Sequence, residues 1–343
     1  MEKKAHVFHS DPYTGMIAIS KKFEDAQNQY GVLKVSSIDA SHHEFVHLHS
    51  NQIRDISFDP FGNTTLLSCS KSKNVKITCL KSNNTVVTYQ APRDCWSCSW
   101  SSTKNHIMYT GLNNGEVMVF DIRNTKESLE TISPLKMNQK CPVISVVSVP
   151  SESGDTPVLV STLQCITYYT KNSENKYTGE QLETPPGALS SVSYEPNSSN
   201  LLASYKPGLK NPKERHVLMK LVESEGTMRS EAIHTFEGGA SQSFRCRSSL
   251  ITCPDDDNHL LVCTGEQETN TVKVWSTKNM ELLQQWAFKK DDGPIISVGV
   301  HRAAGVDYLC GLTNQRIIQY KWLLSKSHFE NNNAAYQFND DQF

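Results

Sequence analysis

The sequence has no apolar run that approaches the roughly 20 consecutive residues needed by a membrane-spanning helix. Its start, MEKKAHVFHSDPYTG, lacks the apolar core of a secretory signal peptide. The ten cysteines are scattered along 343 residues, whereas a disulfide framework is typical of short, cysteine-dense secreted chains. These absences predict a protein of a reducing compartment, cytosol or nucleus, that has no contact with a membrane.

Charge and catalytic motifs argue against further classes of function. The 34 Lys and Arg residues nearly balance the 36 Asp and Glu residues, so the net charge of −2 gives no general attraction for nucleic acid. The sequence contains no Gly-rich phosphate loop, no GxSxG nucleophile motif and no HExxH metal motif. We therefore expect no direct contact with nucleic acid, no cofactor and no catalytic centre in this chain.

What the sequence does contain is a repeat of 42 residues. The segment QIRDISFDPFGNTTLLSCSKSKNVKITCL at 52–80 aligns without gaps on DCWSCSWSSTKNHIMYTGLNNGEVMVFDI at 94–122. In this register Ile53 falls on Cys95 and Phe58 falls on Trp100. Units of about 40–45 residues that each hold several short strands are typical of the blades of a β-propeller.

Weaker copies of the unit precede and follow this pair. They cover 6–49, 144–170, 189–222, 259–288 and 294–322, which makes seven units. We predict an all-β fold, with one seven-bladed propeller of four-stranded antiparallel sheets over residues 1–324. Residues 325–343 are rich in Asn and lack periodicity, which predicts a disordered C-terminal tail. The last blade is then expected to have three strands, or a weak fourth strand at 325–329.

The motif CWSCSW at 95–100 spaces Cys95 and Cys98 as in a redox dithiol or in half of a zinc site. In the 42-residue register, however, it is the innermost strand of the third blade. Side chains alternate between the two faces of a strand, so residues three apart point in opposite directions. We therefore predict that Cys95 and Cys98 are reduced, metal-free and on opposite faces, and that the motif packs in the core.

Two other segments resemble metal sites more weakly. SHHEFVHLHS at 41–50 places His47 and His49 on one face of a strand, but a zinc site needs further ligands. His49 also falls where propeller repeats often have a histidine that hydrogen-bonds between blades. The acidic segment CPDDDNHLL at 253–261 lacks the ligand spacing of a calcium loop and predicts a solvated turn. We expect no metal site.

The remaining candidate is a surface at one rim of the propeller. The leading end of each innermost strand and the turn between the second and third strands face the same rim. In blades two and three these positions hold the residues of a predicted protein-binding surface: Arg54, Lys71, Lys73, Arg93, Trp96 and Asn113. A tryptophan beside arginines has the composition of a binding hot spot. The alternative, that Trp96 packs between blades, stays open.

The repeats are similar to WD repeats, although only VFD at 119–121 keeps their aromatic–aspartate ending in full. A more specific similarity lies in NQIRDISF, TLLSCSKSKNVKITCLKSNNTVVTYQ, CWSCSW and YTGLNNGEVMVFDIRNT, between Gln52 and Thr125. These segments resemble the C-terminal propeller of the RING finger and WD-repeat ubiquitin ligases. Shorter matches at CPVISV, HTFEGG and LLVCTGE extend the resemblance over most of 5–322. It implies a seven-bladed WD-repeat β-propeller.

The resemblance also implies a function, as the recognition part of a nuclear E3 ubiquitin ligase. It implies replication protein A as the partner, and a role in the DNA-damage response and interstrand crosslink repair. A RING needs paired Cys/His clusters that bind zinc, and this sequence has no such array. We therefore expect a ubiquitin-conjugating enzyme to be engaged only through a RING absent from this chain. The alternative is a general WD-repeat scaffold without ligase association.

Overall fold

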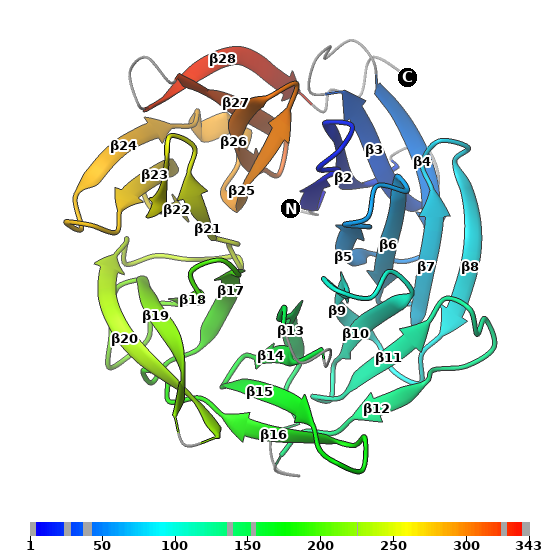
Figure 1. Ribbon diagram of the computed structural model, residues 1–343. Coiled ribbons are helices and arrows are strands. Elements are labelled where there is room, and N and C mark those ends of the chain that lie inside the picture. Colours follow the sequence, from blue (N-terminus) through cyan, green and yellow to red (C-terminus); the bar gives the residue numbers. More distant parts are fainter. Residues whose placement is uncertain are drawn as a thin grey trace.

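A computed structural model shows a ring of seven four-stranded antiparallel sheets around a central channel (Figure 1). It describes residues 5–23, 29–36, 43–135, 140–151, 156–224, 226–323 and 328–337, the last segment from 331 onward as backbone only. The prediction of an all-β, seven-bladed propeller is confirmed. Within these segments the only helical element is a 3₁₀ turn at Lys290–Asp292, and no helix is long and apolar enough to cross a membrane.

Each blade runs in chain order from an innermost strand beside the channel to an outermost strand (Figure 1). Blades one and two consist of β1 (Ala5–Ser10), β2 (Met16–Lys22), β3 (Tyr30–Ser36), β4 (His43–His49), β5 (Ile53–Phe58), β6 (Thr65–Ser70), β7 (Asn74–Cys79) and β8 (Asn84–Gln90). Blades three and four consist of β9 (Cys95–Trp100), β10 (Ile107–Leu112), β11 (Val117–Asp121), β12 (Glu130–Ile132), β13 (Val143–Ser148), β14 (Val158–Thr162), β15 (Ile166–Lys171) and β16 (Tyr177–Gln181).

The remaining three blades follow the same plan. They consist of β17 (Leu189–Glu195), β18 (Asn200–Tyr205), β19 (Arg215–Ser224), β20 (Thr227–Glu237), β21 (Ser249–Cys253), β22 (Asp256–Glu266), β23 (Thr271–Ser276), β24 (Leu282–Ala287), β25 (Ile295–Ala303), β26 (Val306–Thr313), β27 (Arg316–Leu323) and β28 (His328–Gln337). Each sheet is built from four strands that are consecutive in the sequence.

The hydrophobic core lies between neighbouring blades. Between blades two and three, Leu67 and Val75 belong to the same buried cluster as Cys95, Trp100 and Met108. The central strands are buried on both faces, because each sheet packs against a blade on either side; every residue of β10 and β11 is buried. The outermost strands are more exposed, as in β24, where no residue is fully buried.

A β-bulge recurs at the second residue of the innermost strand. In blade two Ile53 pairs with Ser70 and Asp55 with Cys69, which leaves Arg54 as the extra residue. The same shift occurs in blades three, four, five and seven, where the extra residues are Trp96, Ile144, Ser190 and Ile296. A bulge interrupts the two-residue alternation of side chains and changes the direction of the residue that it contains.

The bulge overturns one prediction about the cysteines. Because Trp96 is the extra residue, Cys98 pairs with Thr110 and Cys95 with Leu112, which lie on the same face of β10. Both thiols therefore lie in one buried cluster with Cys69, and their placement on opposite faces is wrong. All ten cysteines are free, and the prediction that the motif packs in the core is confirmed. Burial raises the pKa of each of these three thiols, which disfavours the thiolate that a metal would bind.

The end of the chain also differs from its prediction. Strand β28 pairs antiparallel with β27, so the last blade has four strands of its own, and the expected three-stranded blade is wrong. The alternative, a weak fourth strand at 325–329, is closer, because β28 begins at His328, but it extends to Gln337. The main chain of Phe329 exchanges two hydrogen bonds of 2.8 Å with the Gln284 side chain of blade six. The segment predicted as a tail, 325–343, thus contributes a strand to the propeller, beyond the predicted boundary at 324. Residues 325–327 and 338–343 lie outside the described residues.

His49 has the role expected between blades. Its Nε2 hydrogen-bonds Ser68 Oγ of the neighbouring blade at 2.9 Å, and burial lowers its pKa to about 3. His47 is exposed, because a register shift between Tyr30 and Gly31 separates the two histidines on β4. The two side chains therefore do not share one face.

Candidate functional site

The end of the channel at which the innermost strands begin contains a cavity of about 330 Å³. Every blade contributes to its lining, which comprises His6, Arg54, Trp96, Leu163, Lys206, Ser243, Phe244, Arg245, Arg247 and Ile296. Three of these residues, Arg54, Trp96 and Ile296, are the extra residues of bulges. The repeated bulge therefore turns side chains of separate blades toward one opening, which we call the channel mouth.

Arg54 and Trp96 form the contact that links blades two and three at the channel mouth. The Arg54 guanidinium carbon lies 4.5 Å from the centroid of the Trp96 ring, a cation–π geometry. Trp96 is half-buried and belongs to none of the hydrophobic clusters among the described residues. It contacts the neighbouring blade through the charged side chain of Arg54, and it also lines the cavity.

The structure brings the other predicted surface residues to the same rim. Lys71 and Lys73 are exposed on the turn between β6 and β7, and Arg93 is exposed just before β9. Asn113 is half-buried and donates its backbone N–H to the Asp94 carbonyl at 3.0 Å. The pKa of Lys71 is lowered by desolvation and by the positive charge of Arg54. Arg54 and Trp96 line the channel mouth itself, while the other four residues stand on the rim around it.

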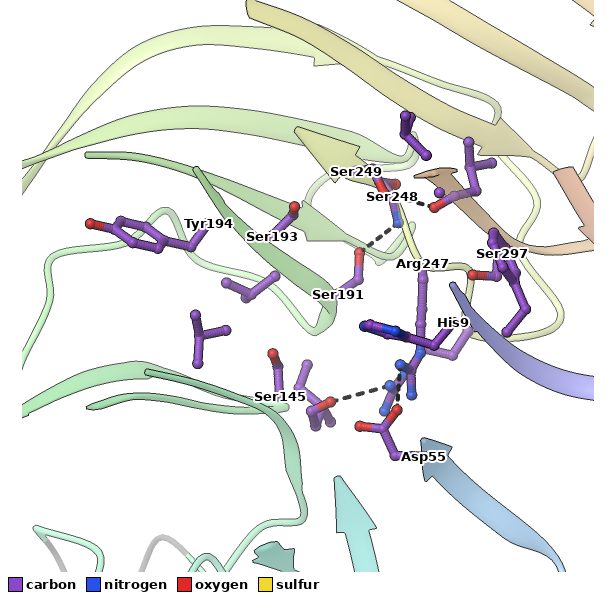
Figure 2. Close-up of a pocket in the computed structure, with 18 of the residues that line it drawn as sticks. His9, Asp55, Ser145, Ser191, Ser193, Tyr194, Arg247, Ser248, Ser249 and Ser297 are labelled. Atoms are coloured by element: carbon purple, nitrogen blue, oxygen red, sulfur yellow. Dashed lines mark hydrogen bonds and ion pairs between the residues drawn. The ribbon is translucent and has the colours of Figure 1, made fainter. Parts of the chain in front are cut away.

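Sequence reasoning missed two arginines that enter the channel from blade six. Arg247 donates from Nη1 to Asp55 Oδ1 at 2.7 Å and from Nη2 to the Arg54 carbonyl at 3.3 Å. Arg245 donates from Nη2 to the Ile144 carbonyl of blade four at 3.2 Å. Figure 2 shows Arg247 crossing the channel to Asp55, with His9 beside it. Both arginines precede β21, in the segment FRCR at 244–247, which lies between the repeat units identified at 189–222 and 259–288.

The channel mouth carries an excess of positive charge. Asp55 is already bonded to Arg247, to the backbone N–H of Ile56 at 3.0 Å and to that of Cys98 at 3.1 Å. Desolvation and the nearby Arg247 guanidinium lower the pKa of Arg245 to about 9. Desolvation likewise lowers the pKa of Arg54 and that of Lys206. In all three residues the main cause is burial, so these pKa directions indicate cations that are partly removed from water.

Deeper in the channel, serines dominate the lining. The cavity that continues from the channel mouth has about 360 Å³ and is lined by Arg245 and Arg247 together with Ser145, Ser191, Ser193, Ser248, Ser249 and Ser297. His9 and Asp55 also line it, but His9 Nδ1 contacts the main chain of Ser10 and Phe58, while Asp55 binds Arg247. The serine, histidine and carboxylate therefore form no proton relay of the kind that activates a nucleophile.

Comparison with known proteins agrees with this architecture. The family described as the E3 ubiquitin-protein ligase RFWD3 WD40 domain matches residues 1–321. The E3 ubiquitin-protein ligase RFWD3 of Homo sapiens is 28% identical over 302 residues, and that of Ailuropoda melanoleuca is equally identical over the same length. The protein of Mus musculus is 26% identical over 302 residues. Each alignment covers 85% of this chain and 38% of the relative.

The resemblance seen in the sequence is thereby confirmed at the level of the family. The chain spans well under half the length of the curated relatives that it matches. The shared region is the propeller, and it includes the blades that build the channel mouth. The chain belongs to the family of RFWD3 WD40 domains.

Proposed function

We propose that this propeller is the partner-recognition domain of an RFWD3-like E3 ubiquitin ligase and that it binds replication protein A in the nucleus. In this role it selects a substrate in the DNA-damage response, including interstrand crosslink repair. Catalysis of ubiquitin transfer belongs to a RING outside this chain, which would engage the ubiquitin-conjugating enzyme. The family membership supports the ligase association, and the resemblance found in the sequence supports the partner.

The observation that carries the recognition role is the Arg54–Trp96 pair at the channel mouth. A half-buried aromatic ring beside guanidinium groups is the kind of anchor that dominates protein interfaces. The exposed cations Lys71, Lys73 and Arg93 surround this pair on the rim. Cations around an anchor increase the association rate with an acidic partner surface. We therefore place the contact with replication protein A on blades two and three.

Replacing Trp96 with alanine tests the proposal. Trp96→Ala should weaken binding to replication protein A by about 2 kcal/mol, roughly 30-fold in Kd, because it removes the anchor of the interface. Its melting temperature should stay close to that of the wild type, since the side chain lies outside the hydrophobic clusters. Affinity is measured by isothermal titration calorimetry and stability by calorimetric melting.

Trp275→Ala is the matched control, because Trp275 packs against a cluster of blades five and six. It should lower the melting temperature and leave the affinity of the folded protein unchanged. If Trp96→Ala instead costs the 3–5 kcal/mol of a core residue and leaves affinity unchanged, Trp96 only packs between blades. If the wild-type propeller does not bind replication protein A but does bind other proteins, the result would favour a general WD-repeat scaffold.

A further inference from the structure

We propose that the channel mouth binds a phosphate group, carried by a phosphorylated serine or threonine in an extended segment of the partner protein. The inference rests on the proposed function, in which the channel mouth receives a protein. It adds the chemistry of the group that enters the cavity. The argument has three steps: the charges present, the hydrogen bonds left unmade, and the shape of the anion that matches both.

Four cationic side chains line the cavity, and none of the described residues that line it is a carboxylate. They come from three separate blades: Arg54 from blade two, Lys206 after β18 of blade five, and Arg245 and Arg247 before β21 of blade six. Holding like charges together in a partly desolvated cavity is unfavourable unless an anion offsets the repulsion. The arrangement is therefore complementary to a ligand of more than one negative charge.

Carboxylates near the channel mouth leave this excess in place. Asp55 is bound to Arg247 and to two backbone N–H groups. Asp94 acts on Arg54 and Lys71 from outside the cavity lining. Glu214 lies near Lys206, but burial raises the pKa of this carboxyl to about 8, so at neutral pH most molecules carry it protonated. Each of these three carboxyls is therefore occupied, outside the cavity or largely neutral.

Hydrogen-bond donors in the cavity are also left unused. Arg54 Nε is buried and has no hydrogen-bond partner among the described residues. Arg245 makes a hydrogen bond from Nη2 to the Ile144 carbonyl, although a guanidinium carries five N–H donors. A buried donor without a partner costs on the order of 1–3 kcal/mol. An acceptor that enters the cavity would remove this cost.

A phosphate group matches these features better than a carboxylate. It carries a charge of about −1.5 to −2 at neutral pH and presents three acceptor oxygens to guanidinium groups from different directions. A single carboxylate carries one charge and satisfies fewer donors. Apolar residues of the lining, Leu163, Phe244 and Trp96, would contact the carbon atoms of the segment that carries the phosphate. The cavity opens beside the Trp96 anchor, which is where the proposed partner lies.

Fluorescence anisotropy with three labelled peptides tests the inference. The peptides share a Gly- and Ala-rich background and differ at one central residue, which is phosphoserine, serine or glutamate. The phosphoserine peptide should bind at least about tenfold tighter than the glutamate peptide, because it makes additional charge-assisted hydrogen bonds. Inorganic phosphate at high concentration should displace it.

Variants of single cations locate the site. Arg245→Gln and Lys206→Gln should each weaken binding of the phosphoserine peptide by about tenfold. Arg302→Gln is the matched control, since Arg302 is an exposed arginine of blade seven outside the cavity lining. Arg247 is unsuitable, because its loss would leave Asp55 buried and unpaired. Melting temperatures near the wild-type value show that the variants are folded; two substitutions in different blades guard against the misfolding of one.

Equal affinity for the three peptides would overturn the inference, and so would tighter binding of a single-stranded oligonucleotide than of the phosphoserine peptide. A loss of peptide binding in Arg302→Gln equal to that in Arg245→Gln would also overturn it, because the attraction would then be unspecific. The proposed function fails separately, when wild-type protein does not bind replication protein A or when Trp96→Ala leaves that binding intact. The two results can therefore be told apart.

Discussion

At the scale of single residues, two buried carboxyl groups differ in their surroundings: that of Asp55 is paired with an arginine, and that of Glu214 has no hydrogen-bond partner among the described residues. The Arg247–Asp55 ion pair joins blades six and two across the channel at 2.7 Å, and Asp55 also accepts the Cys98 N–H of blade three. Such a pair specifies geometry more than it adds stability, because the desolvation of both charges offsets much of their attraction. Glu214 is 1% exposed, and neither oxygen of its carboxyl group has a hydrogen-bond partner among the described residues.

Glu214 should make the stability of the domain depend on pH. Burial and the nearby Glu266 raise its pKa from 4.5 in the unfolded chain to about 8 in the folded protein. The folded state therefore keeps a proton that the unfolded state loses, so this residue's contribution to the free energy of unfolding falls as the pH rises from 4.5 to 8. Glu214→Gln should stabilise the domain by about 1–3 kcal/mol at pH 7.5 and have little effect at pH 4.

Urea denaturation of wild type and variant at both pH values measures this difference. Glu231→Gln serves as the control, because Glu231 is an exposed glutamate on β20. Its effect on unfolding should be small and equal at the two pH values. A stabilisation by Glu214→Gln that is the same at pH 4 and pH 7.5 would show that the Glu214 carboxyl does not titrate abnormally.

At the scale of strands, the repeated bulge determines where functional side chains point. Strict alternation places Cys95 and Cys98 on opposite faces, whereas one extra residue, Trp96, brings both thiols to the same side. The alignment of 52–80 with 94–122 predicts strand positions well, because both segments carry the bulge and stay in register. The alignment does not reveal the bulge, because β5 and β9 contain it at the same position and no gap results. Its presence follows only from the pairing with the second strand.

Most of strand β28 lies beyond the weak strand expected at 325–329, and it escaped prediction because its sequence is polar. The segment HFENNNAAYQ shows no apolar alternation, and one ring, that of Phe329, provides its described contact with the core. Phe329 is 1% exposed and packs edge-on against Trp322, with ring centroids 4.7 Å apart. The backbone pairs with β27, and the main chain of Phe329 also bonds the Gln284 side chain of blade six. Composition alone could not distinguish such an outer strand from a disordered tail.

Phe329→Ala should therefore destabilise the propeller by about 3 kcal/mol, because it leaves a cavity between β28 and the Trp322 ring. The free energy of unfolding from guanidinium denaturation measures this loss. Phe61→Ala is the control, since the Phe61 side chain is 38% exposed, and it should cost much less. A cost below about 0.5 kcal/mol for Phe329→Ala would mean that β28 does not pack on the last blade in solution.

At the scale of the whole molecule, closure of the ring brings distant parts of the chain to one opening. Asp55 and Arg247 are 192 residues apart in the sequence and in direct contact across the channel. The repeat register identified the residues of the channel mouth in blades two and three, where the repeats align without gaps. It missed Arg245, Arg247 and Lys206, because blades five and six are irregular in length and their residues could not be placed on the same register. The number of blades was therefore predictable from the sequence, whereas the residues that blades five and six contribute to the channel mouth were not.

Hydrogen–deuterium exchange of the propeller, with and without replication protein A, tests most directly that a partner binds at the channel mouth. The account predicts slower exchange in the rim segments 71–73, 91–94 and 240–247, which surround the cavity. The turns at the other end of the innermost strands, 59–64 and 101–106, should exchange at an unchanged rate. Protection confined to those turns, or to the outermost strands, would contradict the account.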